Sequence, residues 1–152
     1  MVDKFFNEAF KQAHLAIKEN SGGPFGAVVV HRDRIIGRGR NTVLRDHDPT
    51  AHAEMNAIRE AAVKIKKHNL GECFLVSTSE PCPMCLMAAH WADLQKIYYA
   101  APNFLAGQYG FRDEKLAQMI NNSHIRAIEV DGFYQQAVDL FELWKEQGGQ
   151  VY

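Results

Sequence analysis

The spacing of hydrophobic residues along the chain predicts a series of helices. Apolar residues recur every three or four positions in residues 3–19, which is typical of an amphipathic helix. The same spacing predicts helices over residues 52–67 and 134–147. Two shorter stretches, residues 83–92 and 113–121, complete the set of helices that we predict.

Short runs of β-branched and aromatic residues between these helices predict five strands. The first two, residues 26–30 and 35–41, are separated by a polar turn and are typical of a hairpin. The other three are residues 73–78, 96–100 and 125–130. Because strands alternate with helices in the middle of the chain, we expect an α/β fold, a sheet with parallel pairs and helices on both faces.

The stretches without either pattern, residues 42–51 and 102–112, are predicted to be loops. The sequence shows no internal repeat, low-complexity tract or linker, and 152 residues is an ordinary length for one domain. We therefore expect residues 1–152 to form a single domain.

Composition and charge exclude some classes of function. Hydrophobic residues make up 47% and charged residues 23% of the chain, and the net charge of −1 gives no general attraction to nucleic acid or to an anionic membrane. No apolar run approaches the roughly 20 residues of a membrane span, and the first residues lack the basic and apolar segments of a signal peptide. We expect a cytoplasmic protein without membrane or nucleic-acid partners.

The cysteines point to metal chemistry. An odd number, three, argues against a disulfide framework, and a Cys-x-x-Cys pair in a reducing compartment is typical of metal binding or redox chemistry. Cys82 and Cys85 form such a pair. If Cys82 caps a helix, Pro83 takes the first helical position, where proline is favoured. Both sulfurs then lie at a helix N-terminus, which favours thiolates.

His52 and Glu54 supply the other half of this predicted site. At the first turn of a helix both side chains can approach one metal ion. His52 and the two cysteines would give zinc three ligands and leave the fourth position for water, as in catalytic zinc sites. Glu54 could take a proton from that water and pass it to a substrate, which requires a raised pKa in a dry pocket. The pattern predicts a zinc hydrolase and favours deamination.

Two simpler interpretations of these residues remain open. Cys82 and Cys85 could form a redox pair. Alternatively, a structural zinc ion could take a fourth ligand from His47, His90 or Cys73 and stabilise an interaction module without enzyme activity. Cys73 can also be a buried strand residue that behaves as a small hydrophobe.

Three segments resemble the cytidine deaminase-like zinc deaminases, whose signature is His-x-Glu followed by Pro-Cys-x-x-Cys. They are residues 22–28, 48–54 and 80–85, and together with residues 109–113 and the final Gln-Val-Tyr they are similar to bacterial guanine deaminases. The resemblance covers nearly the whole chain. It implies a three-layer α/β/α sandwich with a mixed central sheet, and a homodimer in which the C-terminal segment can be swapped between subunits.

The resemblance also implies a role for individual residues. His52, Cys82 and Cys85 would bind Zn²⁺, and Glu54 would shuttle the proton. Asp113 would be a second catalytic residue that assists proton transfer. The implied substrate-binding residues are Asn41, which would hydrogen-bond a purine, Phe25 and Trp91, which would wall the pocket, and Tyr152, which would close the site. Each of these five residues has a simpler interpretation, namely a turn for the asparagine, core packing for the two aromatic residues, a helix cap for the aspartate and a frayed terminus for the tyrosine.

The leading hypothesis is that the protein converts guanine and water to xanthine and ammonia. The second is deamination of another small heterocycle or nucleoside, such as cytosine, an adenosine-type substrate or a triazine. The third is adenosine deamination in tRNA, which needs a cationic surface beside the site. The acidic residues of the last predicted helix, Asp139, Glu142 and Glu146, argue against the third hypothesis.

Overall fold

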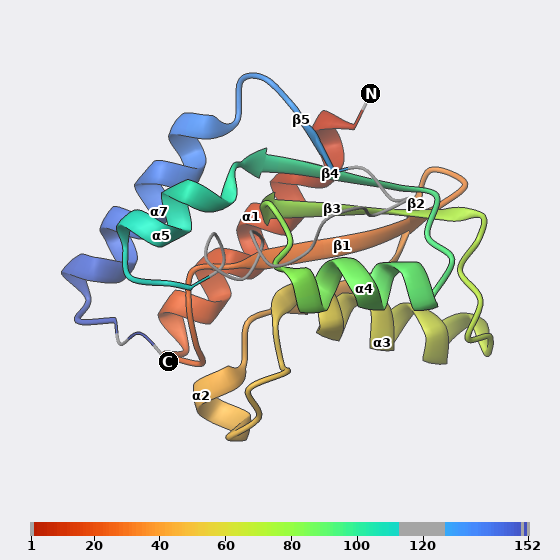
Figure 1. Ribbon diagram of the computed structural model, residues 1–152, viewed down its shortest axis with the longest axis horizontal. Helices are drawn as coiled ribbons and strands as arrows, with labels where there is room; N and C mark the ends of the chain where they lie inside the picture. The colour runs from red at the N-terminus through yellow and green to blue at the C-terminus, as the bar shows by residue number, and fades with distance from the viewer. Residues whose placement is uncertain (1, 113–126, 150, 152) are drawn as a thin grey trace.

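The computed structural model describes residues 2–112, 127–149 and 151 (Figure 1). The elements in chain order are α1 (Asp3–Lys18), β1 (Gly26–His31), β2 (Arg34–Arg40), α2 (Val43–Asp46), α3 (Ala53–Ile65), β3 (Cys73–Ser79), α4 (Pro83–Trp91), β4 (Lys96–Ala101), α5 (Asn103–Gln108), β5 (Ala127–Glu129) and α7 (Tyr134–Glu146). None of these helices combines the length and apolar character that a membrane span would need.

The strands form one mixed sheet in the order β2-β1-β3-β4-β5. Strand β1 pairs antiparallel with both β2 and β3, whereas β3, β4 and β5 run parallel to one another. The chain crosses from β3 to β4 through α4, as a parallel connection requires. The carboxyl ends of β3 and β4 therefore lie at the same edge of the sheet, directly before α4 and α5.

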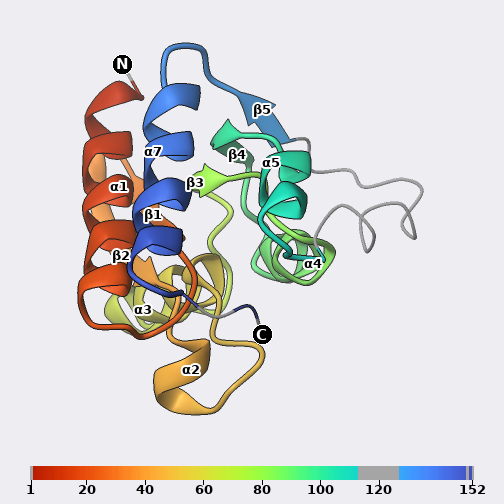
Figure 2. The same cartoon turned by 90° about the vertical axis from the view of Figure 1, so that its left-hand side faces the viewer.

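Helices cover both faces of the sheet, as the sequence predicted. Helices α1 and α7 lie side by side on one face, and α3 and α4 lie on the other (Figures 1 and 2). The core between the layers is made of the buried sheet residues, among them Val28, Leu75 and Ile97, and of aromatic residues from α1 and α7 such as Phe6 and Phe141. The fold is the α/β/α sandwich with a mixed sheet that the sequence resemblance implied.

Glycines in β2 allow α3 to pack directly on the strand backbone. A Cβ atom on Gly39 would lie 1.9 Å from the carbonyl oxygen of Ala53, and one on Gly37 would lie 2.1 Å from that of Ala57. No side chain fits there, so these positions require glycine although it is unfavourable in strands. The contact with Ala53 fixes the first turn of α3, which immediately follows His52.

Two predicted loops contain short helices instead. Residues 42–51 include the four-residue helix α2, and residues 102–112 include α5. Both helices are too short to show hydrophobic periodicity. The predicted helix over residues 113–121 lies outside the described residues, while the strand predicted at 125–130 is confirmed in its described part as β5.

Candidate active site

Two helices begin at the predicted metal site. His52 is the N-cap residue of α3 and Cys82 is the N-cap residue of α4, both with extended backbones, and Pro83 occupies the start of α4 as expected. Neither cap side chain forms a capping hydrogen bond. Helix α3 starts below the sheet and α4 starts just after β3, so the positive ends of both helix dipoles face the same small volume.

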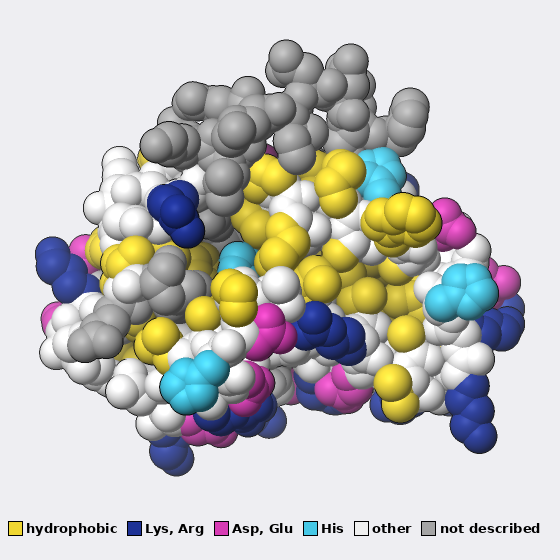
Figure 3. All heavy atoms as spheres, turned by 60° about the horizontal axis from the view of Figure 1, so that its bottom comes forward, with side chains coloured by type: hydrophobic (Ala, Val, Ile, Leu, Met, Phe, Trp, Pro, Cys, Tyr) yellow, Lys and Arg dark blue, Asp and Glu magenta, His cyan; other side chains and the backbone are white. Residues whose placement is uncertain are grey.

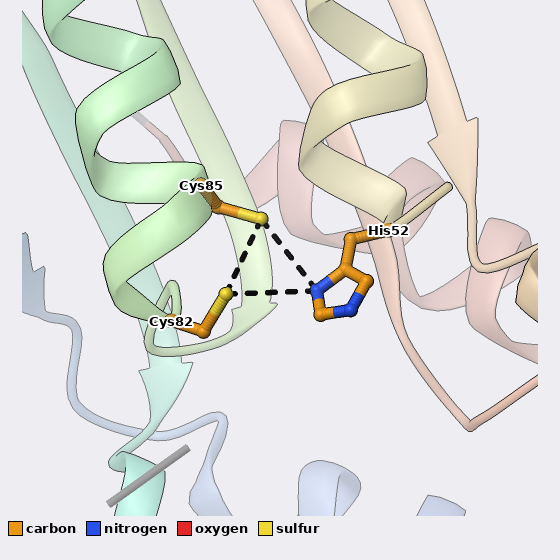
Figure 4. A group of neighbouring side chains, drawn as sticks. All are labelled: His52, Cys82 and Cys85. Atoms are coloured by element: carbon orange, nitrogen blue, oxygen red, sulfur yellow. Dashed lines mark hydrogen bonds between the residues drawn. The ribbon is translucent and has the colours of Figure 1, made fainter. Parts of the chain in front are cut away.

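The three predicted ligand atoms form a compact triangle (Figure 4). His52 Nδ1 lies 3.6 Å from Cys82 Sγ and 3.7 Å from Cys85 Sγ, and the two sulfurs are 3.7 Å apart. Tetrahedral zinc with its usual bond lengths would place two sulfurs about 3.8 Å apart and a sulfur and a nitrogen about 3.6 Å apart. The donor set and its geometry therefore fit a zinc ion.

The protonation of the two thiols also suits a cation. The hydrogen bond that joins Cys82 Sγ and Cys85 Sγ, together with the His52 ring beside it, lowers the pKa of Cys82 to about 4. The same bond and burial raise the pKa of Cys85 well above its ordinary value. Cys82 is therefore prepared to lose its proton, as the binding of a metal cation requires.

Glu54 is held beside the triangle by two contacts. Its side chain is buried, Oε1 accepts a hydrogen bond from Ser77 Oγ at 3.2 Å, and Oε2 lies 3.5 Å from Cys85 Sγ. Burial away from water raises the pKa of the Glu54 carboxyl group. A carboxyl group with a raised pKa can alternate between acid and base near neutral pH, which is the property that proton transfer requires.

A small pocket opens beside Glu54 and His52. Its volume is about 180 Å³, below the roughly 300–1,000 Å³ of pockets that take drug-sized ligands, so it suits a single small ring system. Phe25, Met84 and Phe111 are among its apolar walls. Its polar lining includes Asn41, Ser79, Glu80 and Arg112.

Two of the predicted substrate contacts line this pocket. Phe25 packs edge-on against Phe111, with ring centroids 5.0 Å apart, so it belongs to both the pocket and the core. Asn41 is fully buried and its backbone N–H donates to the Phe25 carbonyl at 3.1 Å. Asn41 Oδ1 accepts from the Val43 N–H at 3.1 Å, so the turn interpretation of this residue also holds.

The structure places Trp91 away from the described pocket, so its role as a pocket wall stays a prediction. It ends α4, six residues after Cys85, and it is 88% exposed. Six residues of helix span about 9 Å, which carries Trp91 away from the metal site. Among the described residues it borders a separate surface depression with His68 and Met87. Asp113 and Tyr152 lie outside the described residues.

The structure also brings in pocket residues that the sequence analysis missed. Phe111 and Arg112 lie in the predicted loop, within the segment 109–113 that carries part of the resemblance, but only Asp113 of that segment was assigned a role. Ser77 and Ser79 could have been found, because side chains alternate along a strand and both precede the Cys-x-x-Cys helix on the same face as the site. The proposed fourth ligands His47, His90 and Cys73 do not join the metal-binding group, which in the described part of the chain consists of His52, Cys82 and Cys85.

A mixed-sheet α/β/α fold with a zinc-type His/Cys/Cys group and an adjacent buried carboxylate defines a zinc-dependent aminohydrolase. Residues 1–101 match the family described as the cytidine and deoxycytidylate deaminase zinc-binding region, and the chain belongs to this family. Comparison with individual proteins extends the likeness to the rest of the chain.

Guanine deaminases are similar over nearly the full length. Guanine deaminase from Bacillus subtilis (strain 168) is 37% identical over 148 residues, which are 94% of this chain and 93% of that protein. The X-ray structure of guanine deaminase from Bacillus subtilis aligns with a TM-score of 0.74 and 34% identity, covering 99% of this chain and 97% of the other. Guanine deaminase from Nitrosomonas europaea aligns with a TM-score of 0.77 and 26% identity, covering 96% and 84% of the two chains.

A second kind of relative matches only part of the chain. The tRNA-specific adenosine deaminase of Aquifex aeolicus is 38% identical over 97 residues, which are 64% of each chain. Relatives named for different substrates thus match this chain, and the guanine deaminases match nearly all of it.

Proposed function

We propose that the protein deaminates guanine to xanthine, with water as co-substrate and ammonia as the second product. The observation that carries this proposal is the small pocket beside Glu54, which is sized for one planar base and is lined by Phe25 and Phe111. The 37% identity to a guanine deaminase over 94% of the chain supports the same substrate. We also propose that residues 1–152 act as one deaminase domain.

The described side chains divide the chemistry between them. His52, Cys82 and Cys85 would hold the zinc ion, which supplies an activated water molecule as nucleophile at neutral pH. Glu54 Oε2, on the side of the thiols, would accept one proton of the water and deliver it to the ring nitrogen next to C2, and would then carry the second proton from the new C2 hydroxyl group to the leaving amine. Net, a C2–O bond forms and the exocyclic C2–N bond breaks. One water proton stays on the ring nitrogen of xanthine, and the other leaves with the amino group as ammonia.

The pocket residues would orient the base. Asn41 would hydrogen-bond the purine, and Phe25 would pack against the flat face of the ring. Asp113 would assist the proton transfer, which is supported by the position of its neighbour Arg112 in the pocket lining. Arg112 and Glu80 place one positive and one negative group at this pocket, and Glu80 is held by the Asn103 N–H at 2.9 Å.

Release of ammonia from guanine by the purified zinc-loaded protein tests this proposal. We expect turnover by the wild type and a loss of about 10²–10⁴ in rate in Glu54→Ala, with zinc still bound. A zinc-loaded protein that does not act on guanine would refute the substrate. Full activity of Glu54→Ala would refute the role of Glu54. Cytosine, adenosine and a triazine serve as comparison substrates, because they represent the second hypothesis.

Adenosine deamination in tRNA is the competing function that the partial match to tRNA-specific deaminases favours. The net charge of −1 gives little electrostatic attraction to a polyanion, whose binding depends on basic surface. We therefore propose a small-molecule substrate. Binding of tRNA that weakens steeply with salt, together with inosine formation, would support the competing function.

We propose a homodimer that uses the outer face of α4. This helix is almost entirely apolar, yet Cys85 and Ala89 are its buried residues, and Trp91 is 88% exposed. Hydrophobic side chains gather on the face formed by α3 and α4 (Figure 3). Exposed apolar patches of this kind usually mark protein contacts. Sedimentation of the wild type as a dimer, and of Trp91→Glu as a monomer, is the expected result.

We also propose that Tyr152 closes the pocket. The preceding residue supports this role, because Val151 Cγ2 lies 3.2 Å from the position of a Cβ atom on Gly110, next to the pocket residue Phe111. The swap of the C-terminal segment between subunits stays a prediction.

We also propose that the enzyme is cytoplasmic. Cys82 and Cys85 must stay reduced to bind a metal ion, and the cytoplasm keeps thiols reduced.

A further inference from the structure

Ser79 has a buried hydroxyl group that the described protein does not satisfy. The residue is 2% exposed, and its Oγ is buried without a hydrogen-bond partner among the described residues. The other hydroxyl groups of this strand end follow the usual rule that buried polar atoms are paired. Thr78 Oγ1 accepts the Gly26 N–H at 3.1 Å, and Ser77 Oγ donates to Glu54 at 3.2 Å. The exception at Ser79 therefore requires an explanation.

The position of Ser79 provides one. It is the last residue of β3, and because side chains alternate along a strand, it lies on the same face as Ser77 and opposite Thr78. On that face Ser77 contacts Glu54, and Ser79 lies two residues closer to Cys82. Ser79 lines the small pocket. An unpaired hydroxyl group thus borders the space into which a substrate must enter.

We propose that Ser79 determines specificity, with its hydroxyl group forming a hydrogen bond to a polar edge atom of the bound base. This inference rests on the proposed deamination of a small heterocycle in the same pocket. A serine hydroxyl can donate to an oxo group or ring nitrogen and can accept from a ring N–H. The aromatic walls Phe25 and Phe111 offer no such pairing, so a polar atom of the ligand would complete the site. The free protein keeps an unfavourable unpaired group that binding satisfies.

Opposite effects on stability and on catalysis follow from this arrangement. Ser79→Ala removes an unpaired buried hydroxyl group, so its thermal midpoint should equal or exceed that of the wild type. Its kcat/KM for guanine should fall roughly tenfold, as for the loss of one neutral hydrogen bond. A residue with a purely structural role would lower the thermal midpoint instead.

Thr78→Val is the matched control on the same strand. It removes a hydroxyl group that is paired with Gly26 on the face away from the pocket. We expect a lower thermal midpoint and unchanged relative rates across substrates. The contrast between neighbouring positions separates the effect of strand damage from the effect of a lost substrate contact.

Base analogues that each lack one edge atom complete the experiment. The panel is 2-aminopurine without the 6-oxygen, 7-deazaguanine without N7, and 9-methylguanine without the N9–H. The loss caused by Ser79→Ala should remain near tenfold for guanine and shrink to less than twofold for one analogue, as in a double-mutant cycle. No loss for guanine, or an equal loss for every base, would overturn the proposal.

The panel also separates this proposal from the proposed function. If the wild type and Ser79→Ala turn over guanine equally, the role of Ser79 fails while guanine deamination stands. If the wild type instead acts on cytosine, the guanine assignment fails, and the same comparison of Ser79→Ala with the wild type on cytosine decides the role of Ser79. In that case an unchanged rate on cytosine would overturn it.

Discussion

Ser77 Oγ donates a hydrogen bond to Glu54 Oε1 at 3.2 Å, which ties the carboxylate to the central strand of the sheet. The other oxygen of Glu54 faces Cys85. The two oxygens therefore have different surroundings, one anchored and one directed to the metal group. Because the N–H of Ser79 also approaches Ser77 Oγ at 3.5 Å, the serine itself is oriented by the strand backbone.

We predict that Ser77→Ala lowers kcat roughly tenfold with little change in KM, because the carboxylate loses its anchor while the pocket walls stay in place. Ser77→Thr keeps the hydroxyl group and should restore most of the rate. Zinc content, measured by atomic absorption, should equal that of the wild type in both variants. Equal rates in Ser77→Ala and the wild type would show that Glu54 does not need this contact.

We predict that zinc stabilises the fold. A ligand that binds only the folded state adds about 2.7 kcal/mol at 100 times its Kd, which for a chain of this length raises the thermal midpoint by roughly 5–10 °C. Calorimetry with zinc and with a chelator measures the shift. His52→Ala removes one ligand and should abolish most of it. A thermal midpoint that is the same with zinc and with the chelator would contradict the metal site.

The buried carboxyl group gives the metal-free protein a specific pH dependence. Burial raises the pKa of Glu54 in the folded state, so the folded chain holds this proton at pH values where the unfolded chain has released it. The contribution of Glu54 to the free energy of unfolding therefore falls as pH rises above about 4.3, by at most about 1.4 kcal/mol per pH unit. Cys82, whose pKa is lowered to about 4, contributes the opposite slope.

Glu54→Gln isolates this effect because it leaves both thiols in place. In chelator, the variant should be about as stable as the wild type near pH 4 and more stable near pH 7. Urea unfolding across this range provides the measurement. A difference that stays constant with pH would mean that Glu54 has the same pKa in the folded and unfolded states.

Gly39→Ala should disturb the site through the fold. Its Cβ atom would lie 1.9 Å from the Ala53 carbonyl oxygen, so α3 must move away from β2. We expect a loss of about 1–3 kcal/mol in the free energy of unfolding and weaker zinc binding, because His52 precedes Ala53. Gly71→Ala is the control, since its Cβ atom would meet only the end of the Asn69 side chain at 3.0 Å and backbone at 3.7 Å. Chemical denaturation and zinc titration test both variants.

The sequence predicted the metal group because its information is local. Pro83 after Cys82, and Glu54 two residues after His52, fix how these side chains sit on a helix start, and the structure has both arrangements. The helices and strands with clear periodicity were likewise predicted to within a few residues. The sheet brings the two ligand segments together, and the alternation of strands and helices was enough to predict such a sheet.

The pocket walls depend on packing between distant segments, which no local pattern records. Phe25 lines the described pocket because it comes immediately before β1. Trp91 lies six residues beyond Cys85 on α4 and is exposed, so its role as a wall stays a prediction. Phe111 lies beyond α5, a helix whose six residues are too few to show a periodicity. The hydroxyl groups of Ser77 and Ser79 follow the two-residue repeat of the strand, which places both on the face of the site.

The use of His52 and Cys82 as N-cap residues has a consequence for the evolution of this chain. Serine, threonine, aspartate or asparagine would hold each helix start more firmly, by about 0.5–2 kcal/mol. Neither residue can be exchanged for one of them without losing a ligand. Substitutions that raise the thermal stability of the protein would therefore have to occur elsewhere in the molecule. At these two helix starts, metal binding and fold stability favour different residues.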